Sequence, residues 1–514
     1  MALNCYTNFH QILAKNAAQF PDRIYVHCID QNKSLTYGTL YGLSNRISHF
    51  LKTHKIKAND RILLLAENSV ENLAVFVSVL RYGASIATVH VEMNQGSLIE
   101  IIKAIDPKII LYQSGLGLEE LKQKAPGIWL LLGEFKGEKN STGFFSEVYN
   151  FTDKDDLSSC AEPDDHGVIF YTSGTVAKPK GVIQTHANAF YNYDATADYL
   201  QLSPGDRVLD CRSYSWLSAQ HMSLGAPLIA GGTTFMAKRF SQSRYFYWLK
   251  KFKINIGFVV PTMVNMLLNR TQNTNIGKLP ELRFLTSSSA PLHEEQWREF
   301  EKIFGITLAQ SCGSSEGGNT AAHRGADRKI GSIGPQLKYQ DVRIVDGDGN
   351  LLKESKTGEI IVGGGKQQAF GYLLPNGKIE LLPEGGHKTG DLGYVDSEGH
   401  LHIVGRAKEL IIRGGINIAP LEIDAVLVLH QAVSEAGTLG IPDKIYGEEI
   451  IAYVSCKKGS KVNPKDLMEH CSKTLPAAKC PKKIIFLNEL PKNSRGKLDR
   501  NALAEFWIKD KFSL

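Results

Sequence analysis

A run of hydroxyl, glycine and lysine residues near the middle of the chain has the composition of an anion-binding loop. It covers residues 169–181 and reads Ile-Phe-Tyr-Thr-Ser-Gly-Thr-Val-Ala-Lys-Pro-Lys-Gly. Glycine leaves backbone N–H groups accessible, short hydroxyls donate hydrogen bonds and lysine adds positive charge, so such a loop can surround a polyphosphate. The spacing differs from the Walker nucleotide loop. Taken alone, the run is equally compatible with a polar turn.

Six further stretches place glycine and hydroxyl residues beside a single acid or base. Each stretch alone indicates a turn first of all, because Gly, Ser and Asp favour turns. The information therefore lies in their order and separation along the chain. The stretches are Ser287-Ser288-Ser289-Ala290-Pro291, Cys312-Gly313-Ser314-Ser315-Glu316, Thr389-Gly390-Asp391, Gly405-Arg406, Arg413-Gly414-Gly415-Ile416-Asn417 and Asn493-Ser494-Arg495-Gly496-Lys497.

The segments that must position these motifs alternate between strand and helix, which indicates βαβ units and mostly parallel sheets. Between residues 331 and 401 the pattern changes to short segments separated by Asp-Gly, Asn-Gly and Glu-Gly pairs, which predict an antiparallel, barrel-like unit. Apolar periodicity predicts helices over residues 9–18, 36–51, 70–82, 187–200 and 217–229, and strands over 61–66, 85–89, 109–112, 128–132, 207–210, 256–260 and 282–286.

Length and composition limit the possible functions. A chain of 514 residues exceeds the size of one hydrophobic core, so more than one domain is expected. The net charge of +6 is slight for this length, which argues against nucleic acid as a partner. The cysteines form no Cys-x-x-Cys pair, and neither a signal peptide nor a run of about 18 apolar residues is present. We therefore expect a soluble cytoplasmic protein without stable membrane insertion, as a monomer or a homodimer.

Taken in order, the motifs resemble those of the adenylate-forming superfamily, which contains acyl- and aryl-CoA synthetases, peptide-synthetase adenylation domains and firefly luciferase. The resemblance covers nearly the whole chain and is closest to the stand-alone acyl-CoA ligases. It implies that the protein activates a carboxylic acid with ATP to an acyl-adenylate, releases pyrophosphate and passes the acyl group to a thiol.

The same resemblance implies an α/β fold with two domains. Residues 1–405 would form a large N-terminal domain of two α/β subdomains plus a β-barrel-like subdomain. Residues 406–514 would form a small mobile α+β lid that rotates between the two half-reactions, with its hinge at Lys408. Gly414 and Gly415 would let the pantetheine arm of CoA pass close to the backbone.

The resemblance also assigns residues to the nucleotide. Asp391 would accept hydrogen bonds from the ribose hydroxyls, with support from Arg406. The remaining residues expected to contact ATP are Thr172, Ser173, Gly174, Thr175, Ser288, Ala290, Pro291 and Ser315.

Three charged residues would act on the reacting phosphates. Glu316 would be a ligand of Mg²⁺, a hard cation that prefers oxygen. Lys180 would hold the β- and γ-phosphates. Lys497 would place a cation between the carboxylate and the α-phosphate, where negative charge develops.

The residues after position 210 would line the acyl pocket. They contain no Asp or Glu between residues 211 and 232, which disfavours an α-amino acid because a buried ammonium group needs a counter-charge. Tyr214 or Trp216 would be an aromatic gate, or either could belong to the core. With Ser215, Gln220 and either Arg212 or His221 nearby, the pocket is expected to favour a short polar or aromatic acid over a long alkyl chain. The expected lining is Tyr214, Trp216, Gln220, Pro261 and Ser287.

Two departures from the family pattern affect ATP binding. Val176-Ala177 replaces a Thr-Gly pair in the loop and removes one hydroxyl donor. Cys312 stands where the family usually has an aromatic residue that stacks on adenine, and a cysteine supplies no flat face. CoA is the expected acyl acceptor, and a separate carrier protein is the alternative acceptor. A different alternative is that the chain is a catalytically silent relative that acts as a binding protein.

Overall fold

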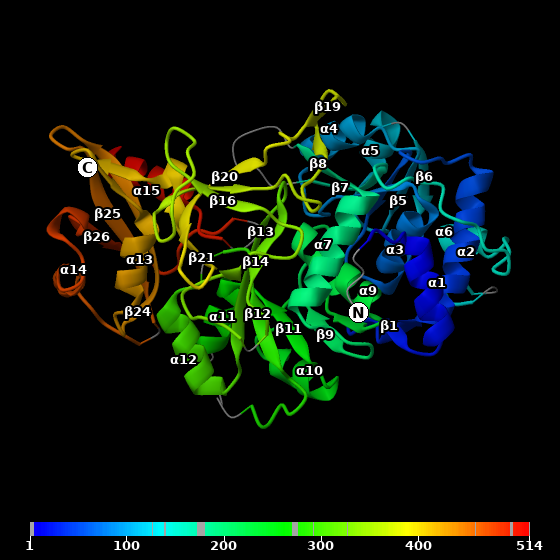
Figure 1. Ribbon diagram of the computed structural model, residues 1–514, viewed down its shortest axis with the longest axis horizontal. Helices are drawn as coiled ribbons and strands as arrows, with labels where there is room; N and C mark the ends of the chain where they lie inside the picture. Colours follow the sequence, from blue (N-terminus) through cyan, green and yellow to red (C-terminus); the bar gives the residue numbers. More distant parts are fainter. Residues whose placement is uncertain are drawn as a thin grey trace.

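The computed structural model describes residues 5–125, 127–137, 140–171, 180–269, 276–290, 292–325, 327–457, 459–493 and 497–512. In this part of the chain the strands form four sheets (Figure 1). Two eight-stranded sheets and a five-stranded antiparallel sheet build the large N-terminal part, and the fourth sheet belongs to the C-terminal part.

The first large sheet has the strand order β14-β13-β12-β11-β9-β10-β1-β2. Its central strands pair in parallel and their residues are almost entirely buried, as the apolar runs predict. The strands are β1 (Ile24–Cys28), β2 (Lys33–Thr36), β9 (Arg207–Asp210), β10 (Thr233–Met236), β11 (Ile256–Val259), β12 (Phe284–Ser287), β13 (Leu308–Ser314) and β14 (Gly318–Ala322).

The second large sheet has the order β19-β18-β8-β7-β4-β3-β5-β6. Strands β7 and β8 are antiparallel, and their last pair joins Tyr171 to Gly181. The strands are β3 (Arg61–Leu65), β4 (Ser85–Thr88), β5 (Ile109–Tyr112), β6 (Ile128–Leu131), β7 (His166–Tyr171), β8 (Gly181–Thr185), β18 (Gly371–Leu373) and β19 (Ile379–Leu381).

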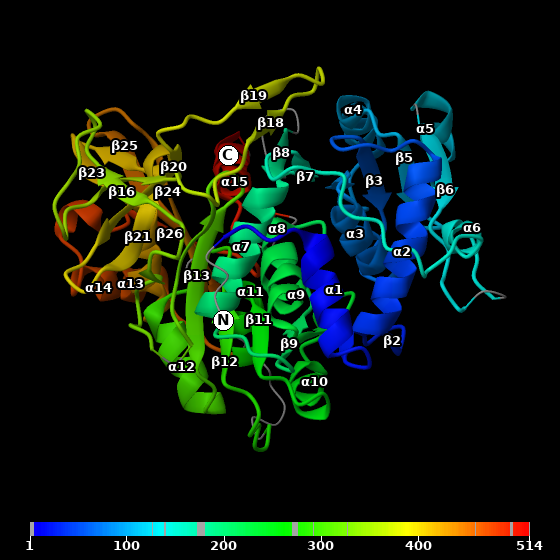
Figure 2. The ribbon, with the colours of Figure 1, turned by 45° about the vertical axis from the view of Figure 1, so that its right-hand side comes forward.

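Helices fill the space between the two sheets. Figures 1 and 2 show α7 there, and it contacts β14 of the first sheet as well as β7 and β8 of the second. Helix α2 begins after Thr36, whose hydroxyl accepts a hydrogen bond from the Thr39 N–H (3.2 Å), as expected for an N-cap. The helices of this part are α1 (Phe9–Gln19), α2 (Tyr37–Thr53), α3 (Val70–Tyr82), α4 (Gln95–Ile105), α5 (Glu119–Lys124), α6 (Phe144–Val148), α7 (His186–Tyr199), α10 (Tyr245–Lys251), α11 (Pro261–Leu268) and α12 (Glu294–Phe304).

The helix predicted over residues 217–229 contains a π-helical turn. It runs as α8 (Leu217–Ala219), the π turn η1 (Gln220–Gly225) and α9 (Ala226–Ala230). The segment packs closely against α7 at Gly225. A side chain has no room at this position, since a Cβ there would lie 2.1 Å from the Tyr193 ring. Such π turns widen one helical turn and re-aim its side chains.

The antiparallel unit predicted between residues 331 and 401 forms the five-stranded sheet β15-β21-β20-β17-β16. One hairpin of this stretch, β18–β19, instead extends the second large sheet by pairing β18 with β8. The strands of the antiparallel sheet are β15 (Gly334–Pro335), β16 (Val342–Val345), β17 (Gly358–Val362), β20 (His387–Val395) and β21 (His400–Arg406).

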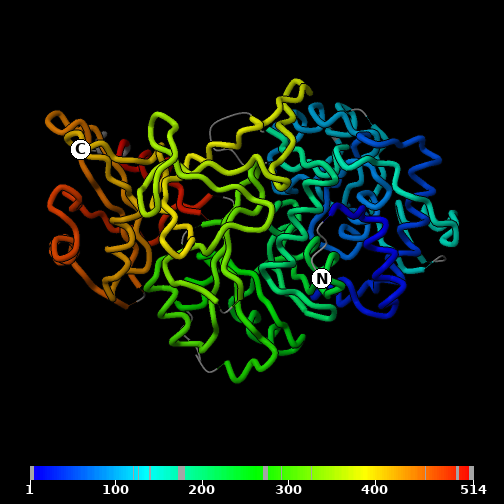
Figure 3. Tube along the Cα trace, viewed as in Figure 1, coloured from blue at the N-terminus to red at the C-terminus, as the bar shows by residue number. Residues whose placement is uncertain are grey.

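The C-terminal part has a sheet and a hydrophobic core of its own. Figure 3 shows it, in orange and red, at one end of the molecule beside the antiparallel sheet. Its elements are η2 (Ala407–Glu409), β22 (Ile411–Arg413), β23 (Ile416–Ile418), α13 (Pro420–Val428), β24 (Val433–Asp443), β25 (Gly447–Cys456), α14 (Pro464–Ser472), η3 (Ala477–Lys479), β26 (Lys483–Phe486) and α15 (Arg500–Phe512).

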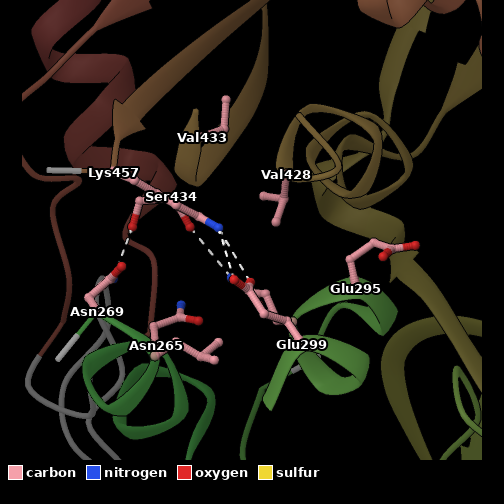
Figure 4. A pocket seen from close by; sticks show the side chains of 10 residues that line it. Asn265, Asn269, Glu295, Glu299, Val428, Val433, Ser434 and Lys457 are labelled. Carbon is pink, nitrogen blue, oxygen red and sulfur yellow. Dashed lines mark hydrogen bonds and ion pairs between the residues drawn. The ribbon is translucent and has the colours of Figure 1, made fainter. Parts of the chain in front are cut away.

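The C-terminal domain touches α11 and α12 through a small set of polar contacts around a small cavity (Figure 4). Lys457 pairs with Glu299 (Nζ to Oε2, 3.3 Å). The side-chain amide of Asn269 donates to Ser434 Oγ (3.3 Å), and that of Gln296 donates to the Ser434 carbonyl (3.4 Å). Across the described residues, no helix combines the length and apolarity needed to span a bilayer.

Candidate functional site

Asp391 and Arg406 face each other across two antiparallel strands. The register of β20 and β21 pairs the two residues directly, and Arg406 Nε lies 2.8 Å from Asp391 Oδ1. The backbone N–H of Asp391 donates to Thr389 Oγ1 (3.0 Å). The carboxylate keeps 25% of its side-chain surface exposed, so it can accept hydrogen bonds from a ligand while Arg406 holds it in place.

Lys497 of the C-terminal domain lies near the same carboxylate. Partial burial raises the pKa of Asp391 above its usual value, and the positive charges of Arg406 and Lys497 act in the opposite direction. Because such a charge effect requires proximity, the fold brings Lys497 to a residue more than a hundred positions earlier in the sequence. Burial, with a smaller contribution from Asp391, raises the pKa of Cys312 to about 12, which places this thiol at the same site in its neutral form.

Glu316 follows β13 and forms a second charged centre. The hydroxyl of Tyr372 donates to Glu316 Oε1 (2.9 Å), and His387 Nε2 lies 4.0 Å from Oε2. Burial and the Glu316 charge raise the pKa of Tyr372 well above its usual value, so the phenol stays protonated and remains a donor. Lys180 Nζ lies 5.0 Å from the centre of the Tyr372 ring. Tyr372 therefore links two residues predicted to act on phosphate.

Sequence reasoning missed both Tyr372 and His387. Tyr372 lies in β18, with apolar or small residues on either side, and His387 begins β20. Nothing in their local sequence distinguishes them from ordinary strand residues. Only the pairing of β18 with β8 brings Tyr372 next to Lys180 and Glu316.

The donor set at Glu316 fits one kind of metal site. Among the described residues there is no group of three or more His, Cys, Asp or Glu side chains that could hold a metal ion. A single carboxylate suits Mg²⁺ bound together with phosphate, because this ion keeps several waters and takes only one or two protein ligands in phosphate sites. Glu316 thus fits Mg²⁺ carried by a nucleotide.

Arg212 and Asp210 form a buried ion pair behind the expected acyl pocket. Arg212 Nη2 lies 2.7 Å from Asp210 Oδ2, and both side chains are fully buried. Arg212 Nη1 also donates to Ser288 Oγ and to Ser218 Oγ, each at 3.2 Å. Because these hydroxyl oxygens already accept from Arg212, their own hydrogens remain available to a neighbouring group.

The expected pocket residues have different environments. Tyr214 is 2% exposed and belongs to the main hydrophobic core. Gln220 is buried, and its amide donates to Thr88 Oγ1 (2.9 Å) and to the Tyr214 carbonyl (2.7 Å). Trp216 is partly exposed and stacks on His90, with ring centres 6.0 Å apart. Of the two aromatic residues, Trp216 is the one accessible from outside.

Pro261 and Ser287 stand at the carboxyl ends of neighbouring parallel strands. Pro261 begins α11 one residue after the end of β11, with Val260 between them, and Ser287 ends β12. Two residues further, Ser289 adopts a left-handed backbone conformation with φ of 77°. Such a conformation costs a non-glycine residue about 1–2 kcal/mol and is often found at functional sites. Ala290 is partly exposed beside it.

Lys408 and the Gly414-Gly415 pair lie on the surface of the C-terminal domain. Lys408 is exposed in the short helix η2, between the antiparallel sheet and the C-terminal sheet. Gly414 and Gly415 form the β22–β23 turn with φ of 58° and 81°, and the Gly414 N–H donates to the Tyr446 carbonyl (2.8 Å). Ser315 is partly exposed next to Glu316.

Part of the expected phosphate site lies outside the described residues. This concerns Thr172, Ser173, Gly174 and Thr175, the Val176-Ala177 pair and Pro291. The strand ends that flank the loop are described, and Lys180 directly precedes the second of these strands, β8.

The chain matches two family models. Residues 13–373 match the model of the AMP-binding enzymes, and residues 422–497 match that of the AMP-binding enzyme C-terminal domain.

Two curated relatives and one solved structure resemble the chain over nearly its full length. The sulfoacetate–CoA ligase of Cupriavidus necator is 30% identical, over 95% of this chain and 96% of the relative. The oxalate–CoA ligase of Arabidopsis thaliana is 29% identical, over 97% and 98%. The crystal structure of ATP-bound MatB from Rhodopseudomonas palustris superimposes with a TM-score of 0.86 at 24% identity, over 98% of this chain and 99% of that one.

Proposed function

We propose a substrate class for this chain, which belongs to the family of AMP-binding enzymes and is an ATP-dependent acid–thiol ligase. The enzyme forms an acyl-adenylate and passes the acyl group to CoA. We propose that its acid is short and polar. We further propose that Lys497 and Glu316 act on the reacting phosphates. The observation that carries this assignment is the proximity of Lys497 to the Asp391–Arg406 pair.

In the first half-reaction Asp391 accepts hydrogen bonds from the ribose hydroxyls, and Arg406 keeps its carboxylate oriented. An oxygen of the acid attacks the α-phosphorus of ATP, and the bond to the bridging oxygen of pyrophosphate breaks. Negative charge builds up between the acid and the phosphate during this step. The ammonium group of Lys497 compensates that charge from a fixed position, which is the most effective form of electrostatic catalysis.

The phosphate end of the site is formed by Glu316, Lys180 and the loop before it. Glu316 would hold Mg²⁺, with its carboxylate oriented by Tyr372. When bound, the ion neutralises phosphate charge. Lys180 stabilises the departing pyrophosphate. The remaining residues proposed here are Thr172, Ser173, Gly174, Thr175, Ser288, Ala290, Pro291 and Ser315.

The second half-reaction requires a different arrangement of the two domains. The thiol of CoA attacks the acyl carbon, and AMP leaves with the bonding electrons. We place the boundary between residues 405 and 406 and the hinge at Lys408, whose side chain is exposed in a short helix between the two domains. The Gly414-Gly415 turn then offers a surface without side chains to the pantetheine arm.

The wall behind the acyl pocket supports a short, polar acid. Arg212 directs the hydroxyls of Ser218 and Ser288 so that they donate, and its own charge is balanced by Asp210. A hydroxyl-rich wall leaves a polar group of the substrate hydrogen-bonded, whereas a long alkyl chain would gain little there. Two relatives of similar length are named for sulfoacetate and oxalate, both small acids with a second charged group. Trp216 closes the mouth of this pocket, with Pro261 and Ser287 at its base.

The test is acid-dependent pyrophosphate release, measured with and without CoA. The panel contains sulfoacetate, oxalate and malonate as small polar acids, benzoate as an aromatic acid and octanoate as an alkyl acid. We expect the highest kcat/KM with one of the small polar acids and formation of its CoA thioester. Preference for octanoate would refute the proposed acid class. Pyrophosphate release without a CoA thioester would indicate a carrier protein as the acceptor, and no release with any acid would indicate a silent relative.

A further inference from the structure

The hairpin that carries Lys497 is held by backbone hydrogen bonds. Lys492 and Leu498 form an antiparallel bridge, and the Asn493 N–H donates to the Lys497 carbonyl (2.8 Å). The Lys497 N–H donates in turn to Asn493 Oδ1 (3.1 Å). The backbone of Lys497 is therefore fixed relative to the base of its hairpin, so the direction of its side chain depends on what holds that base.

Arg500 anchors the exit of the hairpin to two different elements. Its Nη2 lies 2.5 Å from Asp424 Oδ2 in α13, and its Nε lies 3.2 Å from Glu409 Oε2 in η2. Arg500 has 13% of its side chain exposed and Asp424 only 2%. The planar guanidinium group reaches both acids at once: it donates a hydrogen bond to Asp424, whereas its contact with Glu409 is an ion pair without a hydrogen bond.

The two acids differ in what they are attached to. Asp424 is part of the interior of the C-terminal domain, where Oδ1 accepts a hydrogen bond from the Thr438 N–H of β24 (2.7 Å). Glu409 is the last residue of η2 and neighbours Lys408, where the hinge is proposed. Arg500 thus joins the rigid interior of the domain to the segment that must change during rotation.

The Arg500 guanidinium also lies near the large domain, and its partner Glu409 lies near the nucleotide site. Burial lowers the pKa of His293 to about 4, with a contribution from the positive charge of Arg500. His293 precedes α12 of the large domain. Glu409 is also close enough to Asp391 for its charge to raise the pKa of that carboxyl, after the larger effects of burial, Arg406 and Lys497. The charged groups around Arg500 are therefore Asp424 and Glu409, and the titratable group that faces it across the domain boundary is His293, neutral at ordinary pH.

We propose that Arg500 is a positioning residue that couples the hinge to Lys497: through Glu409 it holds the hairpin in the direction required for adenylation only while the hinge keeps this orientation. This inference rests on the proposed role of Lys497. It explains how a rotation at residues 407–409 withdraws the lysine from the site without changing the interior of the C-terminal domain, which stays attached through Asp424.

The test uses Arg500→Lys and Glu409→Gln, because both leave Asp424 with a buried cationic partner. Each half-reaction is measured separately: acid-dependent exchange between ATP and pyrophosphate, and thioester formation from pre-made acyl-adenylate and CoA. We expect both variants to lose at least about tenfold in the first half-reaction, since small misplacements of a catalytic group are costly. The KM for ATP and the second half-reaction should remain within about twofold of the wild type.

The matched control is Lys479→Met, which removes an ion pair to Glu422 on the same helix α13 (2.7 Å) but lies on the surface of the domain. It should leave both half-reactions unchanged. Unchanged adenylation in Arg500→Lys and Glu409→Gln, or an equal loss of both half-reactions, would overturn the inference. Lys497→Ala is measured in parallel. If this variant retains adenylation, the proposed role of Lys497 is itself wrong. If Lys497→Ala loses adenylation while the Arg500 and Glu409 variants keep it, only the role of Arg500 is wrong.

Discussion

The two halves of the site are held in place by different kinds of interaction. Asp391 and Arg406 sit opposite each other because an antiparallel strand register pairs them, and the sheet on both sides keeps that register. Lys497 sits on a hairpin whose ends are joined to the C-terminal domain by ion pairs, through Lys492 to Glu435 (2.8 Å) and through Arg500 to Asp424. A strand register cannot shift by less than a residue, whereas side-chain ion pairs can exchange partners.

The contact between the domains is weak by comparison. The Lys457–Glu299 pair has side chains that are 35% and 40% exposed, and such pairs contribute about 0–1 kcal/mol. The large-domain part of the site is therefore held more firmly than the C-terminal part, which we propose to rotate away after adenylation. This division suits the rotation that we propose between the two half-reactions.

Removing the Lys497 cation should have the largest effect. Lys497→Ala is expected to lower adenylation by at least about 100-fold, because a fixed charge at the developing negative charge is lost. Thioester formation from pre-made acyl-adenylate should change by no more than about twofold, since the lysine acts only in the first step. Single-turnover assays of the two steps measure this. Loss of both steps would mean that Lys497 also acts in thioester formation or in the stability of the domain.

Within the rigid half, Tyr372→Phe tests the orientation of Glu316. The variant removes one hydrogen bond to a charged group, worth about 1.5 kcal/mol, so kcat/KM for ATP should fall roughly tenfold. A higher Mg²⁺ concentration should be needed for half-maximal activity. Tyr112→Phe is the control, because its hydroxyl accepts from Lys122 at a distant sheet edge. Equal Mg²⁺ dependence in both variants would argue against Glu316 as the metal ligand.

At the domain contact, charge reversal should have a moderate effect. Glu299→Lys replaces the attraction to Lys457 by repulsion, so the population in the adenylation arrangement should fall and adenylation should slow by about threefold. The double variant with Lys457→Glu should recover most of the loss. The thioester step should be unchanged or faster. If the double variant is no better than the single one, the pair does not influence the domain arrangement.

The smallest expected effect concerns backbone strain beside the acyl pocket. Ser289→Gly should raise the free energy of unfolding by about 0.5–1 kcal/mol, because relief of the left-handed conformation exceeds the entropy cost of glycine. The midpoint of thermal unfolding of the whole chain measures this. A lower midpoint would mean that the Ser289 side chain contributes more than its backbone costs.

Most of the secondary structure follows from local patterns. The predicted helices over 9–18, 36–51, 70–82 and 187–200 correspond to α1, α2, α3 and α7. Helices α1 and α2 bury one periodic apolar face, whereas α3 is buried along its whole length and α7 over most of it. The predicted single helix over 217–229 contains a π turn. This segment packs against Tyr193 of α7, and the apolar periodicity of a segment carries no information about such a distant partner. The β18–β19 hairpin joins a different sheet from its neighbours for the same reason: strand pairing is a long-range choice.

The motifs and their order can be read from the residues alone, and their resemblance to those of the adenylate-forming superfamily implies the class of reaction. Which side chains meet cannot be read in this way. Tyr214 packs into the core, whereas Trp216 reaches the surface, and Tyr372 contacts Glu316. In each case the direction of the side chain is set by residues that lie far away in the sequence. The link from Glu409 through Arg500 to Lys497 is likewise a product of packing, in which low-dielectric surroundings make a few charge contacts specific.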